Sequence, residues 1–214
     1  MSADTSTRQP EATRRRILEA AFAEFYEHGF QGGSLARIVA AAGTTKGALF
    51  HHFAGKQALG YAVVDEIIEP LLLERWLSGL EGSDDPISAI EAAFLRHASE
   101  DVESGSWVNG CPLNNLAQEM SPLDEGFHQR IDALYDTWRK GFAEALSRGI
   151  EAGTVDPEIS PKSAATLLVA SQMGIWGTGK SSHDARPMLA ACEAVCDYLE
   201  RLRPEGSMAP SQSP

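Results

Sequence analysis

The stretch SLARIVAAAGTTKGALFHHF, residues 34–53, contains two short helical patterns separated by a glycine. In the first pattern the apolar residues recur at i, i+3, i+4 and i+7, and therefore share one helix face: Leu35, Ile38, Val39 and Ala42. Ser34 is the expected N-cap of this helix. Gly43 ends it, because glycine adopts the left-handed conformation at low cost. The pattern predicts two short helices joined by a tight turn.

The second helix is expected to begin after Thr45 as its N-cap. At about 100° per residue, its inward face holds Leu49, His52 and Phe53. Gly47, Phe50 and His51 point outward, with Lys46 on the flank. In a helix-turn-helix the second helix lies in a DNA major groove, so this outward face is the expected DNA-reading face. Adjacent His51 and His52 diverge along the helix, which favours a packed His52 over a metal site.

Residues 13–59, TRRRILEAAFAEFYEHGFQGGSLARIVAAAGTTKGALFHHFAGKQAL, resemble the DNA-binding domain of the TetR/AcrR family of one-component transcriptional regulators. The similarity is colinear, from a basic-flanked first helix through a Gly-Phe turn and the Ala-Ala-Gly turn to the Lys-Gly-x-x-aromatic-x-His-Phe segment. It implies a DNA-binding regulator. An ordinary helical hairpin within an enzyme is the alternative interpretation.

Geometry and resemblance together indicate which side chains contact DNA. Phosphate contacts are expected to supply affinity, and contacts to base edges are expected to supply sequence choice. Phe50 stands where relatives usually carry tyrosine, so a hydroxyl contact to phosphate is replaced by an apolar face for a thymine methyl group or a sugar. The predicted DNA-contacting residues are Arg14, Arg15, Arg16, Ser34, Thr44, Thr45, Lys46, Gly47, Phe50, His51 and Lys56.

Charge is distributed unevenly along the 214 residues, whose net charge is −12. Residues 1–56 contain seven Lys or Arg against five acidic residues, a net of +2. Residues 57–214 contain eleven Lys or Arg against twenty-five acidic residues, a net of −14. The acidic part repels DNA and orients the basic end toward it. Local charge, not the total, governs contact with phosphates.

The composition is that of a globular protein, with 43% hydrophobic and 22% charged residues. No apolar run approaches the ~20 residues that span a bilayer. The N-terminal MSADTSTRQPEATRRR lacks the apolar core of a signal peptide. We therefore expect a cytoplasmic protein whose three cysteines are free thiols. No cofactor and no metal are expected.

Helical patterns and cap signals predict an all-α fold of about nine helices. Expected boundaries lie at 11–28, 34–42, 45–53, 56–80 with a kink at Pro70, 87–104, 112–120, 122–152 capped by Ser121, 161–176 and 184–202. The expected organisation is a disordered tail at 1–10, a helix-turn-helix domain at 11–55, an effector-binding and dimerisation domain at 56–203, and a disordered tail at 204–214.

The family resemblance implies that the C-terminal helices form a ligand pocket. Aromatic and methionine side chains suit a pocket for a hydrophobic ligand, although each is individually as consistent with an ordinary core. The candidate pocket residues are Trp76, Phe94, Trp107, Cys111, Leu116, Met120, Tyr135, Trp138, Phe142, Met173 and Trp176.

The resemblance also implies that the last two helices pair with those of a second copy to form a four-helix bundle. Proteins that read palindromic DNA through a helix-turn-helix require a two-fold dimer. A buried hairpin in a monomer is the alternative. The candidate interface residues are Leu168, Gly174, Leu189, Cys192, Val195, Cys196 and Leu199.

Cys111 supports a further hypothesis. The segment GCPLNNLAQEMSPLDEGF resembles a branch of the family that includes electrophile-sensing repressors of the NemR type, with a reactive cysteine at the matching position. Pro112 suits the first position of a helix, and a helix N-terminus lowers the pKa of a thiol. A redox or electrophile sensor is thus one alternative, and a small buried side chain is the other.

Taken together, these patterns predict a ligand-responsive transcriptional repressor that binds a palindromic operator as a homodimer and is released by a small hydrophobic or electrophilic inducer. An enzyme or a small-molecule-binding bundle without DNA binding is the competing class. The sequence contains no glycine-rich phosphate loop, no metal-ligand quartet and no recognisable Ser-His-Asp order, so we expect no catalysis.

Overall fold

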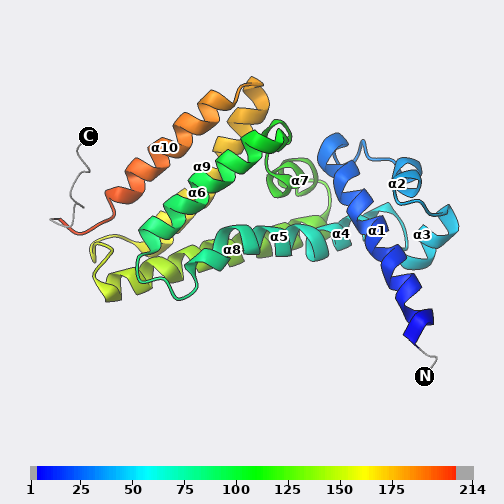
Figure 1. The fold of residues 1–214 in the computed structure, drawn as a ribbon, viewed down its shortest axis with the longest axis horizontal. Helices are drawn as coiled ribbons and strands as arrows, with labels where there is room; N and C mark the ends of the chain where they lie inside the picture. The colour runs from blue at the N-terminus through cyan, green and yellow to red at the C-terminus, as the bar shows by residue number, and fades with distance from the viewer. Residues whose placement is uncertain (1–3, 206–214) are drawn as a thin grey trace. The chain divides into compact units, whose positions relative to one another are not determined.

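The computed structural model describes residues 4–205 and is all-α over that range, as predicted (Figure 1). Residues 1–3 and 206–214 lie outside the described residues; they are three of the ten residues of the predicted N-terminal tail and nine of the eleven of the predicted C-terminal tail. The helices are α1 Asp4–His28, α2 Leu35–Ala41, α3 Lys46–His52, α4 Lys56–Val63, α5 Glu69–Leu77, α6 Pro86–Ser104, α7 Pro112–Met120, α8 Glu125–Ala152, α9 Pro161–Ser182 and α10 Ala185–Glu200. Three short helical segments are η1 Val64–Ile68, η2 Ser78–Leu80 and η3 Ser106–Asn109.

Several helices begin or end where their caps predict. Ser160 caps α9 by accepting from the Ser163 amide, and Asp184 caps α10 by accepting from the Arg186 amide. Helix α9 continues past the predicted end near Trp176 to Ser182, where His183 adopts the left-handed conformation with φ 52°. Helix α1 begins at Asp4, upstream of the predicted start at Glu11.

Helix α8 begins later than predicted because its cap is Asp124 rather than Ser121. The Asp124 carboxylate accepts the amide of Phe127 at 2.9 Å, while the Leu123 and Asp124 amides both donate to the Met120 carbonyl. Ser121 and Pro122 therefore lie in a turn that follows α7. An aspartate at an N-cap provides a charged acceptor for the first free amides of the helix.

The predicted helix at 56–80 is α4, η1 and α5 in succession. Immediately before Pro70, η1 is a π-helical turn in which the Glu69 amide donates to the Val64 carbonyl. Proline has no amide to continue the ladder, and π turns occur where the ladder is interrupted. The interruption predicted at Pro70 thus takes the form of a wider helical turn.

The chain divides into two compact units whose boundaries differ from the predicted ones. The first unit extends to Leu71 and includes Pro112–Ala133, and the second comprises Leu72–Cys111 and the chain from Leu134 onward. In the first unit, aromatic packing joins distant segments: the Phe127 ring of α8 lies 4.8 Å from that of Phe30 and 4.9 Å from that of Tyr61. Helices α4 and α7 therefore belong with the helix-turn-helix.

In the second unit, α10 packs against both α6 and α9 (Figure 1). Helix α10 contributes the apolar side chains of Met188, Cys192 and Leu199 to the core of this unit. Among the residues that the structure describes, no helix has both the length and the apolar composition needed to cross a bilayer.

Candidate DNA interface and effector site

Two side-chain caps and one glycine shape the helix-turn-helix. Ser34 Oγ accepts the Arg37 amide at 3.4 Å, and Thr45 Oγ1 accepts the Ala48 amide at 3.1 Å. Gly43 has φ 58°, a conformation that favours glycine, and it links α2 to α3. Ile38 and Leu49 are fully buried beneath these helices. The caps and the buried residues leave the opposite side of α3 facing outward.

The outward face of α3 carries the predicted DNA-reading residues. Lys46, Gly47, Phe50 and His51 are all exposed. Phe50 is 44% exposed, and Lys46 Nζ lies 5.8 Å from the centre of its ring. Such an arrangement presents a cation, an apolar ring and an imidazole on one helical surface, which are groups that contact phosphates and base edges.

Gly47 is not required by the fold. A Cβ atom at this position would meet only Thr45 Oγ1, at an ordinary 3.8 Å. Glycine within a helix costs about 1 kcal/mol relative to alanine. Gly47 therefore lowers the stability of α3 at an exposed position where packing within the chain does not need a glycine. Glycine is expected at such a position if another molecule approaches the helix closely.

The remaining predicted contact residues differ in whether their side chains are exposed or are held by contacts within the chain. Thr44 is half-buried and its amide donates to the Val39 carbonyl at 3.1 Å, which completes the turn. Arg15 and Arg16 are exposed, with Arg15 bound to Glu19 one turn along α1. Arg14 instead makes an intramolecular bridge: both of its terminal nitrogens lie 2.5 Å from Glu66 carboxylate oxygens.

Lys56 and Glu119 together hold the turn between α1 and α2. Lys56 Nζ donates to the Gln31 carbonyl at 3.0 Å and lies 5.0 Å from the centre of the Phe30 ring. The Glu119 carboxylate of α7 accepts the amides of Phe30 and Gln31, each at 2.8 Å. Lys56 thus has a structural role, and Glu119 was not predicted, because its partners lie almost ninety residues away.

Arg37 is a second residue that sequence reasoning missed. Its Nε lies 2.9 Å from Glu24 Oε1, and the same carboxylate accepts the Ser34 amide at 2.7 Å. The hydrogen bonds from Arg37 lower the pKa of the buried Glu24 carboxyl below its ordinary value, against the opposing effect of burial. This ion pair joins α1 to the start of α2, and an i to i+13 spacing carries no helical signal.

A cluster of aromatic rings occupies the second unit and includes five of the predicted pocket residues. The Trp76 ring is its centre, 5.0 Å from Phe94, 5.3 Å from Trp138 and 5.7 Å from Trp176. Phe142 joins through Trp138 at 6.0 Å. All five are buried, and they come from α5, α6, α8 and α9. Packing has brought together side chains that lie up to a hundred residues apart.

The polar side of this cluster is centred on Asp101. Its carboxylate accepts from Arg75 Nη2 at 2.6 Å, from Trp176 Nε1 at 2.6 Å and from Ser106 Oγ at 2.9 Å. His97 lies 5.0 Å from the Trp76 ring, and burial lowers the pKa of its imidazole. None of these polar residues was predicted, because the individual positions carry no motif.

The other predicted pocket residues are dispersed. Tyr135 and Cys111 are buried in the second unit, and Trp107 and Met173 are half-buried there. Leu116 and Met120 lie on α7, so they belong to the first unit. The Cys111 thiol is only 5% exposed. Reactive cysteines are typically partly exposed, so this burial favours the packing interpretation of Cys111.

The predicted interface residues divide by exposure. Five of them are buried within the single chain: Leu168, Cys192, Val195, Cys196 and Leu199. Gly174 and Leu189 are exposed. The outward face of α9 and α10 also includes Leu167, which is 47% exposed.

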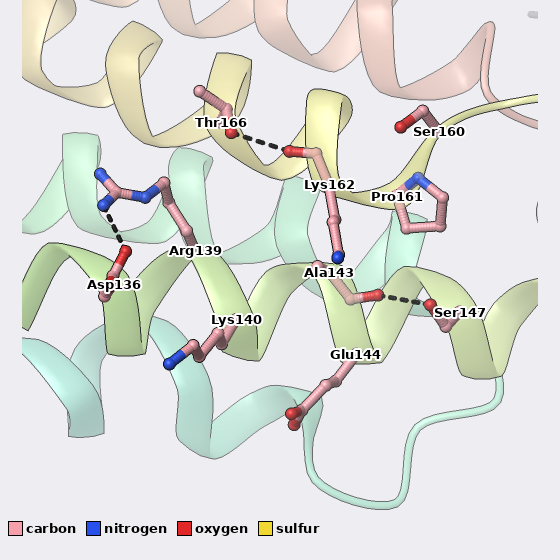
Figure 2. Close-up of a pocket in the computed structure, with 10 residues that line it drawn as sticks. All are labelled: Asp136, Arg139, Lys140, Ala143, Glu144, Ser147, Ser160, Pro161, Lys162 and Thr166. Atoms are coloured by element: carbon pink, nitrogen blue, oxygen red, sulfur yellow. Dashed lines mark hydrogen bonds and ion pairs between the residues drawn. The ribbon is translucent and has the colours of Figure 1, made fainter.

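A surface groove of about 570 Å³ lies between α8 and the start of α9 (Figure 2). Its polar groups are largely paired among themselves: Arg139 donates to Asp136 at 2.6 Å and Thr166 Oγ1 to the Lys162 carbonyl at 2.8 Å. In Figure 2, Lys162 extends from α9 toward α8, whereas Lys140 points away from α9. None of the predicted pocket residues lines this groove.

Metal binding has no support in the part of the chain that the structure describes, where no three His, Cys, Asp or Glu side chains gather as a possible metal site. His52 is half-buried, and burial is the main cause that lowers its pKa. His52 is thus partly buried, less so than the packed core histidine that the helix geometry predicts.

Comparisons with protein families match both parts of the chain. Residues 17–63 match the family described as "Bacterial regulatory proteins, tetR family", and residues 89–195 match "Tetracyclin repressor-like, C-terminal domain". The first match spans the helix-turn-helix with its caps. The second contains the rings of the aromatic cluster that come from α6, α8 and α9, whereas Trp76 precedes it.

Similar proteins are regulators rather than enzymes. The HTH-type transcriptional repressor DhaR of Mycobacterium sp. strain GP1 is 28% identical over 75% of this chain and 79% of its own length. The HTH-type transcriptional regulator LmrA of Bacillus subtilis is 28% identical over 88% and 97%. A solved TetR transcriptional regulator from Chloroflexus aurantiacus has a TM-score of 0.79 and 28% identity, covering 91% of this chain and 97% of that one. Reduced E. coli NemR, with a TM-score of 0.71 and 21% identity over 92% and 99%, shares the fold.

Proposed function

Because this chain belongs to the tetR family of bacterial regulatory proteins and is a transcriptional regulator with a helix-turn-helix, we propose that it is a dimeric repressor of a palindromic operator, released by a small-molecule inducer. The outward face of α3 carries this proposal. There Lys46, Phe50 and His51 are exposed around Gly47, a glycine that the packing of the chain does not require.

Phosphate binding is assigned to the exposed cations and caps. Arg15, Arg16 and Lys46 are exposed, and the contacts of Arg15 and Arg16 stay within α1, whereas Arg14 and Lys56 act mainly by holding the domain together. Phe50 and His51 face the base edges. The acidic remainder of the chain repels DNA, so non-specific binding is restricted to this basic surface.

Dimerisation is assigned to the outward face of α9 and α10. Leu167 and Leu189 are large apolar side chains exposed on this face, and Gly174 between them leaves room for close helix approach. A two-fold pair presents two recognition helices to half-sites about 34–36 Å apart, one turn of DNA.

Induction follows from ligand binding in the second unit. An inducer that binds better to a conformation with a different spacing of recognition helices shifts the dimer to that conformation and releases the operator. A protein that acts on DNA in this way works in the cytoplasm.

The decisive experiment selects an operator from random duplex DNA, tests it alongside the protein's own upstream region, and measures affinity over a series of salt concentrations. We expect Lys46→Ala to weaken binding and reduce the slope of log affinity against log salt by about one. His51→Ala is expected to weaken binding with relaxed sequence preference.

The matched control is Lys162→Ala, which removes an exposed lysine of the second unit and leaves both affinity and slope unchanged. Binding that is independent of salt, or equal affinities for all three variants, would overturn the assignment of the α3 surface to DNA.

A further inference from the structure

Three buried polar atoms of the second unit have no hydrogen-bond partner within the described protein: Tyr135 Oη, Trp138 Nε1 and Gln172 Oε1. All three side chains are more than nine-tenths buried. Burying a donor or an acceptor without a partner is unfavourable, because the group loses its hydrogen bonds to water. Native proteins contain few such groups, so three in one unit require a specific explanation.

The three atoms lie on two helices of the second unit. Tyr135 and Trp138 are three residues apart on α8, and Gln172 and Trp176 are four apart on α9, so each pair shares a helix face. The Trp76 ring connects the two pairs, at 5.3 Å from Trp138 and 5.7 Å from Trp176. Trp138 is thus part of the aromatic cluster, and Tyr135 and Gln172 each lie about one helical turn from one of its rings.

Trp138 and Trp176, whose rings both pack on Trp76, differ in the hydrogen bonding of their indoles. The indole of Trp176 donates to the Asp101 carboxylate at 2.6 Å, whereas the equally buried indole of Trp138 donates to no group of the described residues. The cluster therefore satisfies one indole internally and leaves the other available to a bound molecule.

The chemistry of the three groups specifies what would satisfy them. An indole N–H only donates, and a glutamine carbonyl oxygen only accepts. Burial raises the pKa of Tyr135, so it remains a neutral phenol that can donate. A complementary ligand needs an acceptor for Trp138 and Tyr135, a donor for Gln172, and a flat apolar body to lie among the rings.

The basic groups at the cluster are already engaged, which determines the ligand's charge. Arg75 is bound to Asp101 at 2.6 Å. Burial holds the pKa of His97 below its usual value, and its ring contacts the Arg75 carbonyl and Glu100. An anionic ligand would be buried without a counter-charge, which is strongly unfavourable.

We propose that the inducer is a small, neutral aromatic compound with a carbonyl oxygen and a hydroxyl or amide donor, which inserts beside Trp76 and pairs with Tyr135, Trp138 and Gln172. This rests on the proposed function, in that the second unit is taken as the inducer-binding unit. The ligand would satisfy at once the three groups that the protein leaves unpaired.

The test uses the full-length protein and four related compounds in titration calorimetry, with tryptophan fluorescence as a second readout. para-Hydroxyacetophenone has both the acceptor and the donor. para-Methoxyacetophenone lacks the donor, para-ethylphenol lacks the carbonyl, and para-hydroxybenzoate is anionic. We expect the first to bind most tightly and each of the others to bind about tenfold or more weakly, as expected for one lost hydrogen bond or one buried charge.

Two variants assign the contacts. Tyr135→Phe and Gln172→Met each remove one unpaired group while keeping the volume, so we expect an unchanged or higher melting temperature together with about tenfold weaker binding of para-hydroxyacetophenone. Tyr198→Phe, which removes a hydroxyl outside the cluster, is the matched control and keeps full affinity. If one variant fails to fold, the proposal is still tested by the other variant and by comparing para-hydroxyacetophenone with para-methoxyacetophenone on the wild type.

Failure of para-hydroxyacetophenone to bind the wild type at millimolar concentration would overturn the proposal, as would equal affinity of both variants and the wild type. In that case a buried water would be the partner of these atoms. Operator binding measured on the same proteins separates the two claims: retained DNA binding without ligand binding refutes the inducer class alone. If the protein binds the ligand but binds no operator DNA, the chemical class of the ligand is supported and the proposed repressor function is refuted.

Discussion

The indole Nε1 of Trp176 donates a hydrogen bond to the Asp101 carboxylate across 2.6 Å, which connects α9 to α6 over 75 residues of chain. Because Arg75 and Ser106 donate to the same carboxylate, this one side chain joins α5, α6, η3 and α9. A single buried carboxylate thus accepts hydrogen bonds from three separate segments beside the aromatic cluster.

Replacing this acceptor should destabilise the second unit. Asp101→Ala leaves the Trp176 indole without its partner and the Arg75 guanidinium with only the His97 carbonyl, and we expect a loss of about 2–4 kcal/mol in the free energy of unfolding. Urea denaturation followed by tryptophan fluorescence measures it. Asp197→Ala, on the exposed side of α10, is the control. A change below about 0.5 kcal/mol for Asp101→Ala would show that the network does not stabilise the fold.

Acid should weaken the helix-turn-helix through Glu24. The Arg37 hydrogen bonds lower the pKa of the Glu24 carboxyl in the folded state. Since the folded pKa lies below the unfolded value, the stabilisation is complete above the unfolded pKa and is lost as the pH falls through the folded one. We expect Glu24→Gln to reduce stability at pH 7 by about 1–2 kcal/mol and to flatten the acid side of the stability profile.

Urea titrations between pH 3 and pH 7 check this expectation, with Glu19→Gln as the control, because Glu19 forms only an exposed bridge to Arg15. Parallel acid profiles for the wild type and Glu24→Gln would contradict it.

Gly47→Ala should separate folding from DNA binding. The added methyl group meets only Thr45 Oγ1 at 3.8 Å, and alanine is the better helix former, so we expect equal stability or a gain of up to about 1 kcal/mol. The same methyl group would hold α3 away from the groove, and we expect at least a ~10-fold loss of operator affinity, equivalent to about 1.4 kcal/mol.

Thermal denaturation and electrophoretic mobility shift measure the two effects of Gly47→Ala. Gly79→Ala, at another exposed glycine with open space around it, should change neither stability nor DNA affinity. Wild-type affinity in Gly47→Ala would mean that DNA does not approach this part of α3.

Charge placed on the outward face of α9 and α10 should prevent dimerisation. Leu189 is 36% exposed and Leu167 is 47% exposed, so Leu189→Glu and Leu167→Glu should fold as single chains but bury a carboxylate in any pair. Light scattering after size-exclusion chromatography is expected to report monomers. Leu95→Glu on α6, at a side chain of similar exposure, keeps the dimer. A dimeric Leu189→Glu together with a dimeric Leu167→Glu would place the interface elsewhere.

The three thiols should react slowly in the folded protein. Burial raises the pKa of Cys192 to about 12 and that of Cys196 to about 11, so the reactive thiolate is scarce at pH 8. Cys111 is buried as well. We expect reaction with a disulfide reagent to be at least ~10-fold slower than in urea. A single fast thiol that disappears in Cys111→Ser would instead favour the electrophile-sensing alternative.

Much of the local structure follows from residues close together in the chain. Ser34, Gly43 and Thr45 cap and separate α2 and α3 as their positions predict, because capping depends on side chains within three residues of the helix end. The exposed positions of Gly47 and Phe50 follow from helical periodicity alone. Helix α7 matches its predicted span, Pro112–Met120.

Local reasoning was wrong where two cap signals compete. Ser121 with Pro122 is a typical helix start, but Asp124 supplies the cap of α8 because Tyr61 and Gln57 of α4 also bind its carboxylate. The predicted pocket included Leu116 and Met120, which belong to the first unit instead. Neither outcome can be read from spacing, since both depend on which helices pack together.

The sequence by itself determined the all-α class, the helix-turn-helix and the face of α3 that reaches outward, because periodicity and capping act over a few residues. Only the tertiary structure decided which polar groups are satisfied. Arg14 is bound to Glu66, the Trp176 indole is bound to Asp101, and the Trp138 indole is left unpaired. Those outcomes depend on contacts across 50 or more residues, and hydrogen bonds of that range form only once packing has brought the partners within about 3 Å.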